Sequence, residues 1–228
     1  ARESFITMAF NAETRKKNIE RFSEDYFDLV IIGGGISGAG VARDASSRGM
    51  KVALIEASDF ASGSSSRSSK LIHGGFRYLE NFEFGLVFEA LSERKILFDI
   101  APHLVHPLKF FLPLYQHSRV GMFKLGLGMW LYDFLSQFDA PEIHSRFDES
   151  QTMKEVPILN SKELCGSYAF YDGYMDDDRL VIETLRSAHA LGALCANYVK
   201  ATGVETVDGK ISAVIAKDMV SGKEFPVR

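Results

Sequence analysis

The chain has 228 residues, a hydrophobic content of 46% and a formal net charge of -4 at pH 7, ordinary values for a globular protein. This length is sufficient for one sizeable core, or for one domain with an insertion. The small acidic excess argues against a nucleic-acid-binding protein, which normally carries an excess of basic residues.

The first 25 residues form a charged N-terminal extension without the apolar segment of a secretory signal. Residues 14–22 predict a polar helix, which we interpret as a solvated lead-in, with an anchor to anionic lipid as the alternative. The cysteines, Cys165 and Cys195, share no motif spacing and are expected to be buried thiols in a reducing compartment. These features favour a cytoplasmic protein.

Residues 28–40 form an apolar run that turns through glycines into a predicted helix, and residues 51–55 predict a second buried strand that ends at Glu56. A G-x-G-x-x-G pattern alone is weak evidence, but here strand, helix, second strand and terminal acid follow in order. This arrangement predicts dinucleotide binding, with the pyrophosphate at the helix N-terminus and Glu56 at a ribose that has no 2′-phosphate. The glycines with this spacing are Gly33, Gly35 and Gly38.

Residues 57–70 are rich in serine and glycine, and by composition alone they would form a flexible linker. They continue directly into residues 71–78, where apolar, basic and aromatic side chains surround a pair of glycines. We therefore expect an ordered loop that follows an extended ligand from its pyrophosphate toward its reactive ring. Gly74 and Gly75 would let the backbone pass against a flat ring system.

Residues 83–100 predict an amphipathic helix that ends before Pro102. Its expected apolar stripe comprises Phe84, Val87, Phe88, Leu91 and Phe98. No metal site is expected from the neighbouring histidines, His103 and His106, because prolines break the helix that would align them.

Residues 110–114 predict a short strand, and residues 119–138 form an almost wholly apolar and aromatic segment. Lys124 and Asp133 interrupt that segment, so it falls short of the roughly 20 apolar residues of a spanning helix. Burial against another part of the fold and an interfacial helix at a membrane are the two interpretations.

The remaining elements are a polar, turn-rich stretch and a return to the sheet. Residues 172–178 are interpreted as a solvated acidic loop that caps a helix over 179–191. Residues 194–199 predict a strand that rejoins the cofactor sheet, and residues 209–225 predict a hairpin with a Ser-Gly turn.

Several of these segments together resemble the FAD-dependent glycerol-3-phosphate dehydrogenases, membrane-associated flavoenzymes with a fold of the glucose-inhibited-division and amino-acid-oxidase type. The resemblance implies an α/β fold, in which a Rossmann-like FAD-binding domain with a parallel sheet carries an inserted α+β substrate or cap segment. It stops before the family's next FAD-domain strand, so we expect the chain to be the first part of a longer protein. The matching segments are residues 31–40, 64–80, 89–94, 101–104 and 171–180.

The resemblance divides the chain into an N-terminal extension, two parts of the FAD-binding domain and the inserted segment. The implied bounds are 1–25 for the extension, 26–100 and 171–228 for the FAD-binding domain, and 101–170 for the inserted segment.

The resemblance also implies which residues bind FAD. The three glycines of the turn hold the pyrophosphate, Glu56 the adenosine ribose, and the backbone of Val199 meets the adenine. The serine-rich loop lines the path to the ribityl chain, and His73 with the following glycines lies beside the isoalloxazine. The implied cofactor-binding residues are Gly33, Gly35, Ile36, Ser37, Gly38, Glu56, Ala57, Ser65, Ser66, Ser69, Lys70, Leu71, His73, Gly74, Gly75 and Val199.

The implied reaction oxidises sn-glycerol 3-phosphate to dihydroxyacetone phosphate by hydride transfer to flavin N5, with His73, Arg77 and Tyr78 at the substrate. A guanidinium at Arg77 would meet phosphate oxygens in bidentate fashion, whereas an ion pair with Glu80 is its structural alternative. His73 is either a general base for the C2 hydroxyl proton or an orienting residue, and both roles stay open.

The implied electron acceptor is a membrane quinone, with oxygen as the alternative in an oxidase. The expected location is cytoplasmic and peripheral on the inner face of the cell membrane, and a homodimer is compatible with the resemblance. Two other functions compete: an amino-acid or amine oxidase of the same fold, and a non-catalytic FAD-binding fragment.

Overall fold

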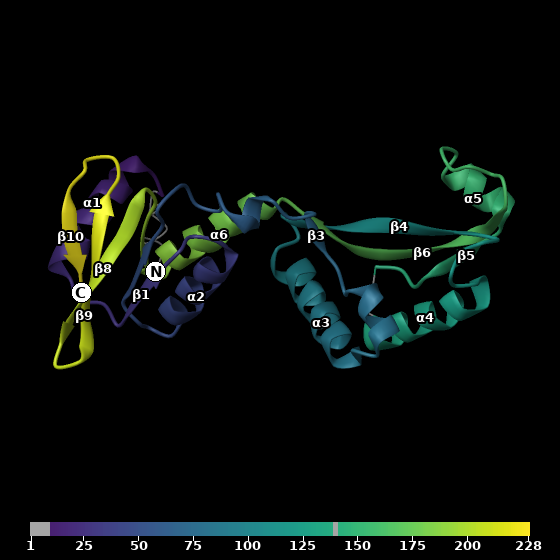
Figure 1. Cartoon of the computed structure of the whole chain (residues 1–228), viewed down its shortest axis with the longest axis horizontal. Coiled ribbons are helices and arrows are strands. Elements are labelled where there is room, and N and C mark those ends of the chain that lie inside the picture. The colour runs from purple at the N-terminus through teal and green to yellow at the C-terminus, as the bar shows by residue number, and fades with distance from the viewer. Residues whose placement is uncertain (1–9, 139–140) are drawn as a thin grey trace, which may run out of the picture. The chain divides into compact units, whose positions relative to one another are not determined.

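The computed structural model describes residues 10–138 and 141–228, and the chain divides into two compact units (Figure 1). The first unit comprises Ala1–Ser68 and Asp177–Arg228, and the second comprises Ser69–Asp176. The division at residues 100 and 170 that the sequence implies stays a prediction.

A parallel sheet forms the centre of the first unit. Its strands are β1 (Leu29–Ile32), β2 (Val52–Ile55) and β7 (Leu194–Ala196), in the order β1-β2-β7. Parallel neighbours need a crossover connection, which α2 (Ile36–Ser47) supplies between β1 and β2. The predicted α/β fold with a parallel sheet is thus confirmed.

The central strand of the parallel sheet, β2, is buried on both faces. In β2, Val52 and Leu54 contact the helical side, where α2 packs with α6 (Asp177–Ala190). The alternate residues, Ala53 and Ile55, face a second hydrophobic cluster on the other side. This double burial explains the continuous apolar run of the strand.

An antiparallel sheet of β8 (Val199–Val207), β9 (Lys210–Asp218) and β10 (Glu224–Val227) adds to the second cluster. The turn between β9 and β10 passes through Ser221 and Gly222, and Gly222 has a φ of 77°. This confirms the predicted hairpin. The strand predicted for residues 194–199 is in fact two strands, since β7 and β8 belong to different sheets.

Helix α1 (Ala12–Glu24) packs on the first unit, so the interpretation of a solvated lead-in is wrong. Asn11 caps it by accepting hydrogen bonds from the N–H groups of Glu13 and Thr14, both at 3.0 Å. Phe22 is fully buried, and the Asn18 side-chain amide donates to the Cys195 carbonyl at 3.0 Å. The helix packs with few apolar residues because polar side chains such as Asn18 also bond to backbone groups of the fold.

The second unit is built on a long antiparallel sheet. Its central strand β6 (Leu164–Met175) pairs with β3 (Leu71–Ile72), β4 (Val105–Tyr115) and β5 (Ser145–Phe147). The prediction for residues 110–114 covers only the middle of β4. The rest of the strand was not predicted because prolines such as Pro107 and Pro113 usually argue against a strand. An edge strand such as β4 tolerates them.

Two expectations for residues near β6 are wrong. Residues 172–175 are not a solvated acidic loop, because Asp172 lies within β6 and is 3% exposed, and α6 begins at Asp177. Cys165 is exposed, whereas Cys195 is buried as expected. The ion-pair partner that compensates for the burial of Asp172 is Arg94, which lies far from it in the sequence.

Helices α3 (Phe84–Ile100) and α4 (Met122–Leu135) belong to the hydrophobic cluster of the second unit, together with residues of β4 and β6. The other helical segments of this unit are η2 (Phe76–Asn81) and α5 (Glu149–Glu155). The predicted helix over 83–100 is confirmed. Its buried residues are Val87, Leu91 and Arg94, whereas Phe84 and Phe88 of the expected apolar stripe are 40% and 44% exposed.

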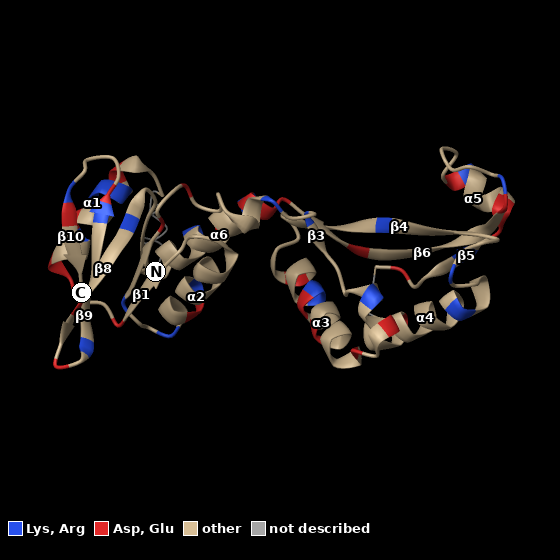
Figure 2. Ribbon diagram, viewed as in Figure 1, with Lys and Arg blue, Asp and Glu red and all other residues tan. Residues whose placement is uncertain are grey.

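Helix α4 buries one side and exposes an apolar stripe on the other. Figure 2 shows α4 mostly without charge, and Lys124 and Asp133 are its charged residues. None of the helices in the described ranges combines the length and the apolar character that a membrane span requires. The exposed stripe consists of Phe123, Leu127, Trp130 and Phe134, whose exposed fractions are 81%, 57%, 55% and 65%.

Candidate functional site

The turn after β1 has the geometry that the glycine pattern predicts. Gly33 has a φ of 118°, a conformation that residues other than glycine rarely adopt. A Cβ on Gly38 would lie 2.0 Å from the Gly33 carbonyl oxygen, so α2 packs directly on the turn. Gly35 is the N-cap of α2 and, as a glycine, has no side chain of its own to cap this helix end. The amides of the first turn, including Ser37, therefore form a small-residue mouth suited to an anion.

Glu56 lies at the end of β2 and contacts this turn. Its Oε2 accepts a hydrogen bond from the Gly34 N–H at 2.7 Å, and its Oε1 accepts one from the Ser58 N–H at 2.7 Å. Ala57, between them, is exposed. The structure thus brings the predicted ribose partner and the predicted pyrophosphate turn together.

The serine-rich loop returns to the same helix end. Ser65, in the 3-10 turn η1 (Ser64–Ser66), accepts a hydrogen bond from the Ile36 N–H at 3.0 Å. Ser66 donates to the Gly63 carbonyl at 3.4 Å. The predicted ordered loop is therefore seen here, and Ser65 already occupies the anion mouth of α2.

Val199 also lies beside Glu56, and it is fully buried. Its N–H donates to the Glu56 carbonyl at 2.7 Å, which continues the pairing of β2 beyond the end of β7. This N–H is therefore engaged with the protein, and the implied contact between the Val199 backbone and adenine stays a prediction.

The second unit holds the other predicted residues. Ser69 is exposed, and Lys70 has a φ of 59° and a side-chain amine 3.6 Å from Asp176. Leu71 opens β3 and pairs with Tyr174 of β6. This short pairing fixes where the His73 segment leaves the sheet.

His73 is exposed, and its ring is held by the backbone that follows. Its Nδ1 accepts a hydrogen bond from the Gly75 N–H at 3.0 Å. A neutral imidazole in this arrangement carries its proton on Nε2, which makes Nε2 a donor. Gly75 is left-handed, with a φ of 69°, and a Cβ there would lie 2.3 Å from the Tyr78 ring.

Arg77 and Tyr78 lie on η2 and are exposed. Glu80, the alternative partner of Arg77, forms its ion pair with Arg119 instead. Within the described ranges Arg77 forms no ion pair, so its guanidinium is available to a ligand. Tyr78 is fixed by its N–H, which donates to the Gly75 carbonyl at 2.7 Å.

A buried polar cluster next to His73 was missed at the sequence level. The Asp172 carboxylate pairs with the Arg94 guanidinium and accepts hydrogen bonds from the Tyr132 hydroxyl, at 2.9 Å to Oδ1 and 3.1 Å to Oδ2. The Tyr132 hydroxyl in turn accepts the Gly74 N–H at 3.0 Å. One available signal was Arg94, a cation at helical spacing from Val87 and Leu91 on the buried face of α3.

Burial is the main electrostatic influence on this cluster. It raises the pKa of the Asp172 carboxyl, an effect that Arg94 and the hydrogen bonds from Tyr132 and Gly74 oppose. Burial also raises the pKa of Tyr132 far above that of a free phenol, and the nearby Asp172 adds to this effect. Tyr132 therefore keeps its proton at neutral pH, and its hydroxyl donates a hydrogen bond to Asp172.

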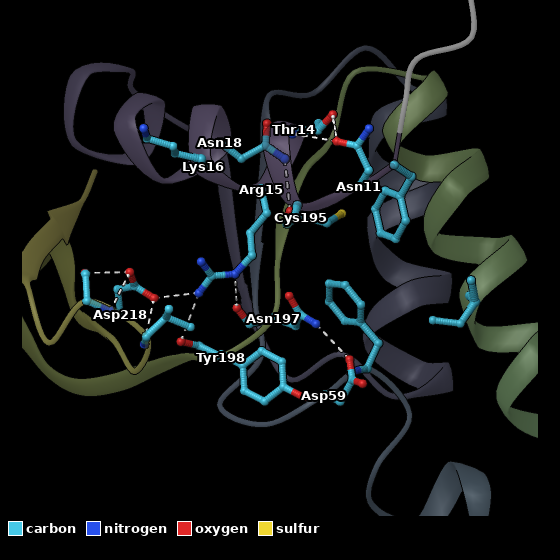
Figure 3. A pocket seen from close by; sticks show the side chains of 16 residues that line it. Asn11, Thr14, Arg15, Lys16, Asn18, Asp59, Cys195, Asn197, Tyr198 and Asp218 are labelled. Carbon is cyan, nitrogen blue, oxygen red and sulfur yellow. Dashed lines mark hydrogen bonds and ion pairs between the residues drawn. The ribbon is translucent and has the colours of Figure 1, made fainter.

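A cavity of about 770 Å³ opens elsewhere in the first unit, beside α1 (Figure 3). Arg15 reaches through it to the Asn197 carbonyl at 2.8 Å and to Asp218 at 2.5 Å. None of the predicted site residues lines this cavity. Several of its polar groups, among them Arg15, Asn18 and Asp218, bind other lining residues, and we assign these groups to holding α1 on the fold.

Burial raises the pKa of the Asp218 carboxyl, but hydrogen bonds from Ser221 and Arg15 outweigh it and hold the pKa below its ordinary value. Within the ranges that the structure describes, no group of three or more His, Cys, Asp or Glu residues is arranged to hold a metal ion.

Comparison with known proteins gives a family match over most of the chain. Residues 28–225 match the family model described as FAD dependent oxidoreductase. Two sequence relatives are a probable glycerol-3-phosphate dehydrogenase of Encephalitozoon cuniculi, 38% identical, and an alpha-glycerophosphate oxidase of Streptococcus pneumoniae, 40% identical. The alignments cover 94% and 97% of this chain but 36% and 37% of the relatives, so the chain spans little more than a third of their length.

A solved structure is similar over the same extent. The glycerol-3-phosphate dehydrogenase from Bacillus halodurans, complexed with FAD, aligns with a TM-score of 0.73 and 32% sequence identity. The alignment covers 96% of this chain and 36% of that protein. Similarity therefore extends through both units of the chain.

Proposed function

The chain belongs to the family of FAD-dependent oxidoreductases, and from this premise we propose that it binds FAD and forms part of an enzyme that oxidises sn-glycerol 3-phosphate to dihydroxyacetone phosphate. The observation that carries the proposal is the convergence of the glycine turn, Glu56 and Ser65 at one end of the parallel sheet. Two of the relatives are named glycerol-3-phosphate dehydrogenases and one is named an alpha-glycerophosphate oxidase. These names support glycerol 3-phosphate as the substrate.

The residues of the first unit fit the nucleotide half of FAD. The diphosphate would bind at the N-terminus of α2, where Gly35 has no side chain and the helix dipole favours an anion, while Gly38 lets α2 pack against the turn. In this proposal Ser65 turns from the Ile36 N–H to the ligand. Glu56 meets the ribose hydroxyls through a carboxylate that already has a fixed orientation.

The second unit supplies the residues for the ring and the substrate. FAD, when bound, supplies the hydride acceptor, and the protein supplies position and electrostatics. Gly74 and Gly75 bring backbone close to the ring, and Arg77 holds the substrate phosphate as a permanently charged fork. Arg77 forms no ion pair with another described residue, which supports this role.

For His73 we propose the orienting role over the general base. Because the Gly75 N–H occupies Nδ1, the neutral ring presents an N–H at Nε2 and has no free lone pair there to take a proton. Nε2 would therefore donate a hydrogen bond to an oxygen of the substrate or the cofactor.

We propose a membrane quinone as the electron acceptor and a peripheral position on the inner, cytoplasmic face of the cell membrane. The exposed stripe of α4 supports this proposal, since Trp130 and the phenylalanines are side chains that partition into the interface. Flotation with anionic liposomes tests the membrane contact, and burial of the stripe against another part of the fold is its alternative. Sedimentation velocity tests separately whether the protein forms a homodimer. Oxygen as the acceptor corresponds to the oxidase among the relatives.

The function is tested by following the product together with the acceptor. The FAD-loaded protein should form dihydroxyacetone phosphate from sn-glycerol 3-phosphate and reduce a soluble quinone analogue in a one-to-one ratio. Oxygen consumption in the same ratio, without the quinone, would assign the oxidase alternative. Turnover of glycine or sarcosine but not glycerol phosphate would assign an amino-acid oxidase, and no turnover would leave a FAD-binding fragment.

A further inference from the structure

Gly74 is enclosed by two helices of the second unit. A Cβ built on it would lie 2.4 Å from the Leu91 side chain of α3 and 2.5 Å from the Tyr132 hydroxyl of α4. These distances are far below a van der Waals contact. The backbone between His73 and Gly75 is therefore pressed against α3 and α4 without an intervening side chain.

The cluster of Arg94, Tyr132 and Asp172, which we call the Gly74 anchor, fixes the direction of this backbone. The Gly74 N–H points to the Tyr132 hydroxyl at 3.0 Å and to Asp172 Oδ1 at 3.4 Å. Pairing of Ile72 with Gly173 places Asp172 one residue from the end of the β3 pairing. The sheet register thus delivers a carboxylate to the point where the His73 segment begins.

Stability alone is a weak explanation for this anchor. Side chains of Arg94 and Asp172 are 2% and 4% exposed, and desolvation of such a pair commonly offsets its Coulomb attraction. The Arg94 Nε atom has no partner among the described residues, which adds to the cost. Outside the pair and Tyr132, the anchor bonds the Tyr171 carbonyl within β6 and the Gly74 N–H.

We propose that the Gly74 anchor positions the His73–Tyr78 segment for hydride transfer, an inference that rests on the proposed function. The residues of the anchor act through the backbone: Asp172 orients the Tyr132 hydroxyl, the hydroxyl holds Gly74, and Gly74 sets the placement of His73 and of the turn that leads to Arg77. They are positioning residues and do not touch substrate.

Tyr132→Phe tests this inference because it removes only the hydroxyl that links Asp172 to Gly74. Tyr168→Phe is the matched control: Tyr168 is also buried, and its hydroxyl donates to the Met122 carbonyl at 3.1 Å, away from the His73 segment. Both variants keep the aromatic packing, and both lose one hydrogen bond to the backbone.

The expected result in the complete, FAD-loaded protein is a split between the two variants. Tyr132→Phe should slow anaerobic flavin reduction by sn-glycerol 3-phosphate about tenfold, since small misplacements of reacting groups are costly, while FAD stays bound. Amide hydrogens of residues 73–78 should exchange faster in Tyr132→Phe than in the parent protein. Tyr168→Phe should match the parent protein in both measurements.

A purely structural role would lower the thermal stability of Tyr132→Phe but leave the reduction rate and the exchange of residues 73–78 as in the parent protein, and that result would overturn the inference. If the parent protein is not reduced by glycerol 3-phosphate, the proposed function fails. The exchange comparison still decides whether the anchor holds the segment, so the two failures are distinguishable.

Discussion

The backbone N–H of Gly34 donates to the carboxylate of Glu56 at 2.7 Å, which ties the turn after β1 to the end of β2. The same carboxylate accepts the Ser58 N–H through its other oxygen. Glu56 is therefore fixed before any ligand arrives, and a ribose would meet a carboxylate that loses little freedom on binding.

Replacement of Glu56 should weaken FAD binding in two steps. Glu56→Gln keeps the shape and one acceptor but loses the charge that strengthens hydrogen bonds from hydroxyls, so we expect about a tenfold rise in the FAD dissociation constant. Glu56→Ala also frees the Gly34 and Ser58 amides and should raise it further. Titration by flavin fluorescence measures both constants, and an unchanged constant in Glu56→Ala would contradict the assignment.

Gly38→Ala should destabilise the first unit. The added Cβ would overlap the Gly33 carbonyl oxygen at 2.0 Å, so α2 must move off the turn at a cost of about 1–3 kcal/mol. Gly40→Ala is the control, because a Cβ there meets nothing within 4 Å and alanine favours the helix. Thermal denaturation should show a lower Tm for Gly38→Ala only, and equal Tm values would disprove the close packing.

Arg77→Ala should raise the KM for glycerol 3-phosphate with a smaller effect on kcat, because its guanidinium would bind the phosphate in ground and transition states alike. Arg77→Lys should recover only part of the affinity, since lysine lacks the planar fork. Arg119→Ala, an exposed arginine paired with Glu80, serves as the control for general loss of positive charge. Equal KM values for Arg77→Ala and Arg119→Ala would exclude a specific role.

His73→Gln separates the two roles considered for His73. If Nε2 acts as a hydrogen-bond donor, glutamine supplies a comparable N–H, and flavin reduction should be faster in His73→Gln than in His73→Ala. A general base requires a group that titrates near neutral pH, so both variants would then be equally slow and lose the same limb of the pH profile. Stopped-flow reduction at several pH values distinguishes these outcomes.

Asp218→Asn should lower stability at pH 7 but not in acid. Because the folded pKa of Asp218 is below its ordinary value, its ionised form stabilises the fold above that ordinary value, about 3.9. This contribution is lost as the pH falls through the lowered folded pKa. The Tm of Asp218→Asn should therefore lie below that of the parent protein at pH 7, and the two should converge once the pH is below the lowered folded pKa. A constant difference down to that pH would refute the linkage.

Local patterns made most of the first unit predictable. The glycine spacing, the apolar run over residues 51–55 and the Ser-Gly turn each determine backbone geometry within a few residues, and β1, α2, β2 and the final hairpin follow them. The packing of α1 was missed because it depends on Arg15 and Asn18, whose backbone partners lie more than 170 residues away.

The candidate site was predictable where its residues are neighbours in the chain or belong to one strand-helix-strand motif, as the glycine turn and Glu56 do. Arg94 and Tyr132 meet Asp172 across 78 and 40 residues, and no spacing rule connects them. Asp172 lies in a run of acidic residues, so composition favoured a solvated loop over a buried strand. In the structure Asp172 instead lies in a buried strand, because β6 pairs with β3 in the sheet.

The central claim is tested most directly by the absorbance spectrum of the purified, complete protein under anaerobic conditions. We predict a yellow protein whose oxidised flavin band bleaches on addition of sn-glycerol 3-phosphate and is unchanged by glycine. A colourless protein that does not take up added FAD, or a flavin band that glycerol 3-phosphate leaves unchanged, would contradict the account.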